Sequence, residues 1–108
     1  MNIQDMQQAA RRASELMKAL SNENRLMILC QLVDGEKAVG QLAAALGLRQ
    51  AAVSQQLALL RKDGLVTPRR AAQTIYYGLD GTAARRVIEL LYDIYCAPAQ
   101  PIDKRRNA

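Results

Sequence analysis

The chain contains two cysteines, Cys30 and Cys96, and no histidine. A thiolate can act as a nucleophile, a metal ligand or one half of a disulfide. A zinc site ordinarily needs about three or four ligands, so two thiols far apart in the sequence give it little support. A thiol enzyme needs an activating base, and the chain has neither histidine nor a C-x-x-C motif. A free cysteine often simply packs in the core, so each thiol taken singly can also be inert.

A second set of candidate residues lies in the stretch from Gln41 to Val66, QLAAALGLRQAAVSQQLALLRKDGLV. Val53, Leu57 and Leu60 recur at i, i+4 and i+7, which predicts a helix with these side chains facing inward. The start and outer face of that helix then carry Arg49, Gln50, Ala51, Ser54 and Gln55. Glutamine can bond an adenine edge, alanine fits beside a thymine methyl, and serine can bind base or phosphate. On an isolated helix the same face would be merely solvated, so the neighbouring elements must decide.

The net charge is +5, and most of the excess lies between Glu36 and Gln73. A basic surface favours a polyanionic partner, although a solvated face is the commoner origin of such charge. The candidates for phosphate contacts are Lys37, Arg69, Arg70 and Gln73. Contacts of this kind set the affinity and its salt dependence rather than the choice of sequence.

Helices and one hairpin must position these residues. The apolar spacing predicts helices at about 3–20, about 23–33, within KAVGQLAAALGL up to Gly47, at about 50–63, and from Asp80 or Thr82 to near Cys96. Two helices joined by a few residues that include a glycine are typical of a helix-turn-helix. LVTPRR and QTIYYGL predict a hairpin with its tip at Arg69 to Ala72. The expected fold is therefore mainly α with a β-hairpin wing, a winged helix-turn-helix.

The length of 108 residues suits one small domain that often needs a partner subunit. We expect this DNA-binding and dimerisation domain at residues 1–97, and a flexible tail at 98–108, which contains Pro98, Pro101 and KRR. The apolar stripes of the first and last helices are left over outside the core, which suits a dimer. No apolar run approaches the roughly 20 residues of a membrane span and the N-terminus lacks a secretory signal, so we expect no membrane partner and a cytoplasmic protein.

Three blocks resemble the signatures of the ArsR/SmtB family of bacterial transcriptional repressors: ALSNENRLMILCQL, GLRQAAVSQQLALLRKDGLV and RRAAQTIYYGL. The resemblance runs from about Lys18 to Cys96. It implies a symmetric homodimer held by the first and last helices, with the fourth helix in the major groove of double-stranded operator DNA and the wing on the adjacent backbone. Relatives commonly carry serine in place of Arg49 and histidine in place of Gln56, so operator preference is expected to differ.

One cysteine late in the second helix and one at the end of the last resemble the thiol-based, sulfide- and redox-sensing branch of this family. There the matching cysteines form a disulfide or polysulfide bridge. The resemblance implies a repressor without cofactors that leaves its operator when Cys30 and Cys96 are bridged, with reactive sulfur species or another oxidant as the inducer. In a reducing cytosol a bridgeable pair suits a reversible switch rather than a structural disulfide.

Other interpretations remain open. The same branch includes activators thought to displace a nucleoid silencer from DNA, and sequence does not separate that action from repression. Metal-responsive relatives carry a thiol at the start of the third helix, where this chain has KAVGQLAAAL, so a metal-responsive repressor is the weaker alternative. A constitutive DNA-binding protein with inert cysteines is a further one, and an enzyme is not expected.

Overall fold

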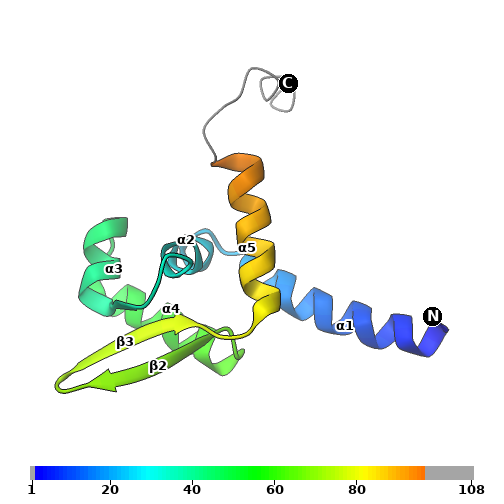
Figure 1. Cartoon of the computed structure of the whole chain (residues 1–108), viewed down its shortest axis with the longest axis horizontal. Coiled ribbons are helices and arrows are strands. Elements are labelled where there is room, and N and C mark those ends of the chain that lie inside the picture. The colour runs from blue at the N-terminus through cyan, green and yellow to red at the C-terminus, as the bar shows by residue number, and fades with distance from the viewer. Residues whose placement is uncertain (1, 97–108) are drawn as a thin grey trace.

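A computed structural model describes residues 2–96, which form five α-helices and one three-stranded sheet. The elements are α1 (Ile3–Leu20), α2 (Glu23–Leu32), β1 (Lys37–Ala38), α3 (Val39–Leu46), α4 (Gln50–Lys62), β2 (Val66–Ala71), β3 (Thr74–Leu79) and α5 (Thr82–Tyr95). Figure 1 shows α1 projecting away from the body, with α5 standing beside α2. The expected tail at 98–108 and the last residue of the expected domain, Ala97, lie outside the described residues.

The helix ends follow local chemistry. The Asn2 side chain accepts a hydrogen bond from the Asp5 amide at 2.8 Å, and the Asn22 side chain accepts one from the Arg25 amide at 3.1 Å. Asn22 is therefore the residue that caps α2. Gly47 ends α3 with φ 66, a left-handed conformation that glycine adopts without strain.

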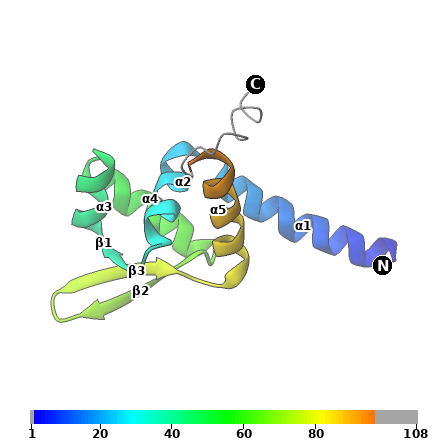
Figure 2. The ribbon, with the colours of Figure 1, turned by 45° about the horizontal axis from the view of Figure 1, so that its top comes forward.

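The sheet has the order β1-β3-β2, with both pairs antiparallel. The sequence prediction missed β1: Lys37 and Ala38 pair with Tyr77 and Tyr76, so the third helix begins only at Val39. A strand of two residues has no periodicity of its own, and only its long-range partner reveals it. Pro68 is tolerated because β2 is an edge strand. Figure 2 shows the hairpin below the helices, with β1 beside β3.

The predicted position of the hairpin tip, Arg69 to Ala72, was wrong. Ala71 still pairs with Thr74, so the turn consists of Ala72 and Gln73, and Ala72 adopts φ 56. Arg69 and Arg70 consequently belong to β2 rather than to the tip. Paired strand residues alternate between two faces, which separates these two neighbours.

The core lies between α2, α3 and α4 and is closed by β2 and α5. The predicted inward residues of α4, Val53, Leu57 and Leu60, are each 0% exposed. Ile28, Leu29 and Leu32 of α2 and Leu42 of α3 meet them, and Ile88 supplies the contact from α5. This apolar contact fixes the orientation of α4 and therefore decides which of its residues face outward.

Large apolar side chains remain exposed on α1 and α5. They are Ile3, Met6 and Met17 on the first helix and Leu90, Tyr92, Ile94 and Tyr95 on the last. An apolar surface of this extent is typical of a protein interface. None of the helices in the described part of the chain combines the length and apolarity that a membrane crossing requires.

Candidate functional site

The outer face of α4 carries the predicted base-reading residues. Arg49, Gln50, Ala51, Ser54 and Gln55 are all exposed. Arg49 occupies the N-cap position and makes no side-chain cap hydrogen bond, as expected for a residue without a short oxygen acceptor. The Arg49 side chain therefore leaves the first backbone amides of α4 free to donate hydrogen bonds to a phosphate group.

The turn before α4 holds it firmly on α3. Gly47 turns the chain, and the Leu48 amide donates a hydrogen bond to the Ala43 carbonyl at 3.0 Å. Leu46 and Leu48 are half-buried and pack against the core on either side of the glycine. The recognition face thus belongs to a helix that packs on the core rather than to a loop.

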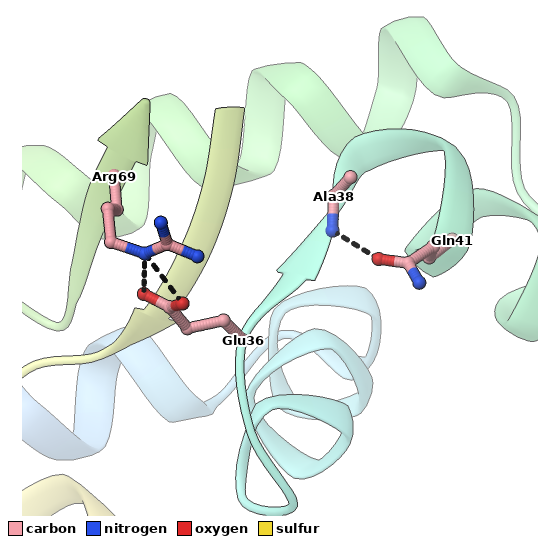
Figure 3. Close-up of polar contacts among 4 residues, drawn as sticks. All are labelled: Glu36, Ala38, Gln41 and Arg69. Atoms are coloured by element: carbon pink, nitrogen blue, oxygen red, sulfur yellow. Dashed lines mark hydrogen bonds and ion pairs between the residues drawn. The ribbon is translucent and has the colours of Figure 1, made fainter. Parts of the chain in front are cut away.

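The two wing arginines have different surroundings. Arg69 Nε donates to Glu36 Oε1 at 2.8 Å and to Oε2 at 3.1 Å (Figure 3), and its Cζ lies 5.2 Å from the centroid of the Tyr76 ring. Arg70 is exposed and pairs across the hairpin with Ile75. Gln73 is exposed at the turn. All three remain predicted phosphate ligands, but the structure does not bring them onto one face.

Lys37 is half-buried, and its side chain contacts the end of α2. Its Nζ donates to the Gln31 carbonyl at 2.7 Å, so it caps the C-terminal end of α2. The positive charge also suits that end of the helix dipole. Next to it, the Gln41 side chain accepts the Ala38 amide at 2.8 Å and takes part in starting α3, as Figure 3 shows.

The two cysteines lie on neighbouring elements, because α2 packs against α5. Cys30 is half-buried, Cys96 is exposed at the end of α5, and both are free thiols. Burial raises the pKa of the Cys30 thiol above its ordinary value, and the negative charge of Cys96 raises it further. The fold thus places the two thiols on helices that pack against each other.

A hollow of about 500 Å³ between α2 and α5 gives solvent access to Cys30. Asp34, Glu89 and Asp93 line it together with Tyr92. Within residues 2–96 no group of three or more cysteine or carboxylate side chains is arranged to hold a metal ion.

Sequence reasoning missed three residues that organise these sites. Arg85 donates from Nη1 to the Val33 carbonyl at 2.9 Å, joining α5 to the end of α2. Glu36 and Tyr76 hold Arg69. No local pattern signals these contacts; the cross-strand pairing of Tyr76 with Arg69 follows only once the hairpin register is known.

Comparison with known proteins agrees with this arrangement. A sequence model of a protein family, the bacterial regulatory proteins of the arsR family, matches residues 22–67. The transcriptional activator HlyU of Vibrio cholerae is 49% identical over 100 residues, which cover 93% of each chain. The chain belongs to the ArsR family.

Two further likenesses place it within the ArsR family. The biofilm growth-associated repressor of Agrobacterium fabrum is 45% identical over 88% of this chain and 81% of its own. The structure of reduced HlyU from Vibrio cholerae superposes with a TM-score of 0.83 at 49% identity, covering 87% of this chain and 99% of that one. The chain is thus a transcriptional regulator related to HlyU and to the biofilm growth-associated repressors.

The predicted winged helix-turn-helix is confirmed. A homodimeric winged helix-turn-helix DNA-binding domain from Mycobacterium bovis matches with a TM-score of 0.73 at 31% identity, over 87% of this chain and 86% of that one. DNA binding and a homodimer are consistent with such relatives. The exposed apolar faces of α1 and α5 offer the surface that a homodimer would cover.

Proposed function

We propose that the chain is a dimeric transcriptional repressor whose affinity for operator DNA falls when Cys30 and Cys96 become bridged. The inducer is a reactive sulfur species or another oxidant. The observation that carries the proposal is the packing of α2, which holds the half-buried Cys30, against α5, whose C-terminal end is the exposed Cys96.

DNA binding is supported by the exposed face of α4. In the proposed complex Gln50, Ala51, Ser54 and Gln55 enter the major groove, and Arg49 contacts a base or phosphate at its edge. Arg70 and Gln73 of the wing and Lys37 contribute to the backbone contacts, which set the salt dependence. Lys37 has to leave the Gln31 carbonyl to do so.

The sensing step begins at the more accessible thiol. Cys96 is exposed, and the raised pKa of Cys30 keeps that thiol protonated at neutral pH. The Cys96 thiolate takes the outer sulfur of a donor persulfide, releasing the donor as a thiol and leaving Cys96 as a persulfide. Cys30 then gives up its proton and attacks the inner sulfur, a Cys30–Cys96 disulfide forms, and sulfide leaves with the electron pair. When both cysteines carry a persulfide, their condensation releases one sulfide and leaves a trisulfide.

Peroxide would reach the same disulfide by another route. The Cys96 thiolate reduces the peroxide to water and becomes a sulfenic acid, which the Cys30 thiol condenses with, releasing a second water. A direct disulfide needs Cα atoms roughly 4.4 to 6.8 Å apart, whereas an inserted sulfur relaxes that limit.

The bridge would act on DNA through α5. It fastens the end of α5 to α2, and α5 also carries the exposed apolar face proposed to form the dimer. A change in that face alters the spacing of the two recognition helices, which must match successive major grooves. A differential affinity of about 1 to 3 kcal/mol between the two states is enough for a useful switch.

The test compares operator affinity with intact mass. Reduced dimer and dimer treated with a persulfide donor are titrated against the promoter region of the chain's own gene. The proposal predicts a loss of affinity of roughly tenfold or more together with a bridged mass, both reversed by dithiothreitol. Cys30→Ser and Cys96→Ser should bind as the reduced protein does before and after treatment. Equal binding by bridged and reduced protein would contradict the switch and leave the DNA-binding role standing.

A second candidate function follows from the 49% identity to a protein named as a transcriptional activator. In this case the dimer activates genes by displacing a nucleoid silencer. The position of the protected DNA distinguishes the two functions: a footprint over the promoter core supports repression, whereas an upstream footprint that excludes a silencer protein supports activation.

A further inference from the structure

The β2–β3 register separates Arg69 and Arg70. Val66, Pro68 and Arg70 share one face of β2 with their partners Leu79, Tyr77 and Ile75. Val66 is 2% exposed and belongs to the core, so this face is turned toward the helices, and α4 packs against β2. Arg70 therefore lies on the same side of the wing as the recognition helix.

The opposite face holds Arg69 through a carboxylate and an aromatic ring. Both carboxylate oxygens of Glu36 accept from its Nε, and the Tyr76 ring lies directly across the hairpin. Gly78, two residues beyond Tyr76 on this face, leaves room for Glu36, since a Cβ there would come within 3.2 Å of Glu36 Cγ. Gly78 leaves space for Glu36, and the Glu36 carboxylate and the Tyr76 ring both contact the Arg69 guanidinium.

Glu36 also belongs to a different part of the fold. It follows α2 by four residues, after a turn in which the Gly35 amide donates to the Leu32 carbonyl at 3.2 Å. The ion pair therefore ties the wing to the segment that leaves α2. Among residues 2–96 no hydrogen bond or ion pair reaches the Arg70 guanidinium, which is exposed.

We infer that the two neighbouring arginines have divided roles: Arg70 contacts DNA phosphate, and Arg69 is a positioning residue that holds the wing in place through Glu36. The inference rests on the proposed DNA-binding function and adds to it a specific structural partner, Glu36. It also revises the expectation, drawn from charge alone, that both arginines contact phosphate.

The test is the salt dependence of DNA binding. Each phosphate contact contributes about one to the slope of log affinity against log salt concentration. Arg70→Gln should lower that slope by about one on a duplex selected by the wild-type dimer, and Arg69→Gln should leave it unchanged. Lys62→Gln is the control for loss of one charge, because it lies at the far end of α4, about 18 Å from Gln50.

Exchanging Glu36 and Arg69 tests whether Arg69 positions the wing or contacts phosphate. The double variant Glu36→Arg with Arg69→Glu keeps the net charge and restores an ion pair of opposite direction. Arg69→Gln should weaken binding about threefold and raise amide exchange in β2 and β3, and the exchanged pair should recover both within about twofold.

The outcomes are distinct. A slope reduced equally in Arg69→Gln and Arg70→Gln, or an exchanged pair that binds as weakly as Arg70→Gln, would overturn the division of roles. Absence of duplex binding by the wild-type dimer would instead overturn the DNA-binding proposal itself. Amide exchange in the wing is measured without DNA, so it tests the positioning role in either case.

Discussion

Arg85 of α5 donates a hydrogen bond from Nη1 to the backbone carbonyl of Val33, at 2.9 Å, just beyond the end of α2. The bond joins the two elements that carry the thiols, since Cys30 precedes Val33 by three residues, Arg85 lies in the first turn of α5 and Cys96 is the C-cap of that helix. The packing of α5 on α2 is therefore fixed by a charged donor as well as by Ile88.

Replacing Arg85 with glutamine should slow bridge formation. The loss of a charge-assisted hydrogen bond at a half-buried site costs about 1 to 2 kcal/mol of the free energy of unfolding. We expect a lower urea midpoint at fixed dimer concentration, and a rate of Cys30–Cys96 bridging several-fold below that of the wild type. The neighbouring, exposed Arg86 supplies the control Arg86→Gln. Equal bridging rates in the two variants would show that the bond does not align the thiols.

The reactivity of Cys30 should depend on Cys96 through pH. Burial raises the pKa of Cys30 and the Cys96 charge raises it further, so the thiolate forms at higher pH than in an exposed cysteine. Cys96→Ser removes the second contribution, and the midpoint of Cys30 alkylation should move to lower pH while staying above that of a free thiol. The rate of iodoacetamide modification of Cys30, followed by peptide mass, measures this. A midpoint unchanged by the substitution would mean that the thiols do not interact.

Substitutions on the exposed face of α4 should lower the specificity of DNA binding without lowering the stability of the fold. Gln50→Ala and Ser54→Ala remove exposed side chains, so the unfolding free energy should stay within about 0.5 kcal/mol of the wild type. Operator binding should weaken by about 1 to 3 kcal/mol for each side chain that no longer reaches a base. Affinity for an unrelated duplex provides the internal control and should change little. Parallel losses on both duplexes would assign these residues to the backbone instead.

The sequence predicted the parts of the fold whose signals are local. Val53, Leu57 and Leu60 occupy one face of α4 because apolar spacing decides burial, and the exposed Gln50 and Ser54 follow from that. β1 was missed and the hairpin tip misplaced, because both depend on which residues pair across the sheet. The Glu36–Arg69 contact was missed for the same reason: only the folded chain brings a residue after α2 onto the wing.

Arg49 offers a stability gain at the recognition helix. It is the N-cap of α4, with φ −72 and ψ 144, and its side chain satisfies none of the free amides. Serine fits this extended conformation and can accept an amide hydrogen bond, so Arg49→Ser should raise the unfolding free energy by about 1 kcal/mol relative to Arg49→Ala. Both variants lose the same charge, which separates the capping effect from electrostatics. Equal denaturant midpoints would show that the first turn is already satisfied by solvent.

The exposed apolar faces predict the effect of a single charge on assembly. Leu90 is 57% exposed on α5 and belongs to the proposed dimer surface together with Ile94. Leu90→Glu would place a carboxylate in that surface, where burying an unpaired charge costs several kcal/mol, so the dimer should dissociate at micromolar concentration. Leu59, 44% exposed on α4 outside this surface, provides the matched control Leu59→Glu, which should remain dimeric. Sedimentation equilibrium measures both. A dimeric Leu90→Glu protein, or a monomeric Leu59→Glu protein, would show that the interface does not lie on α5.

Because two recognition helices must span successive grooves, the monomeric Leu90→Glu variant should also lose nearly all specific operator affinity while its α4 surface stays intact.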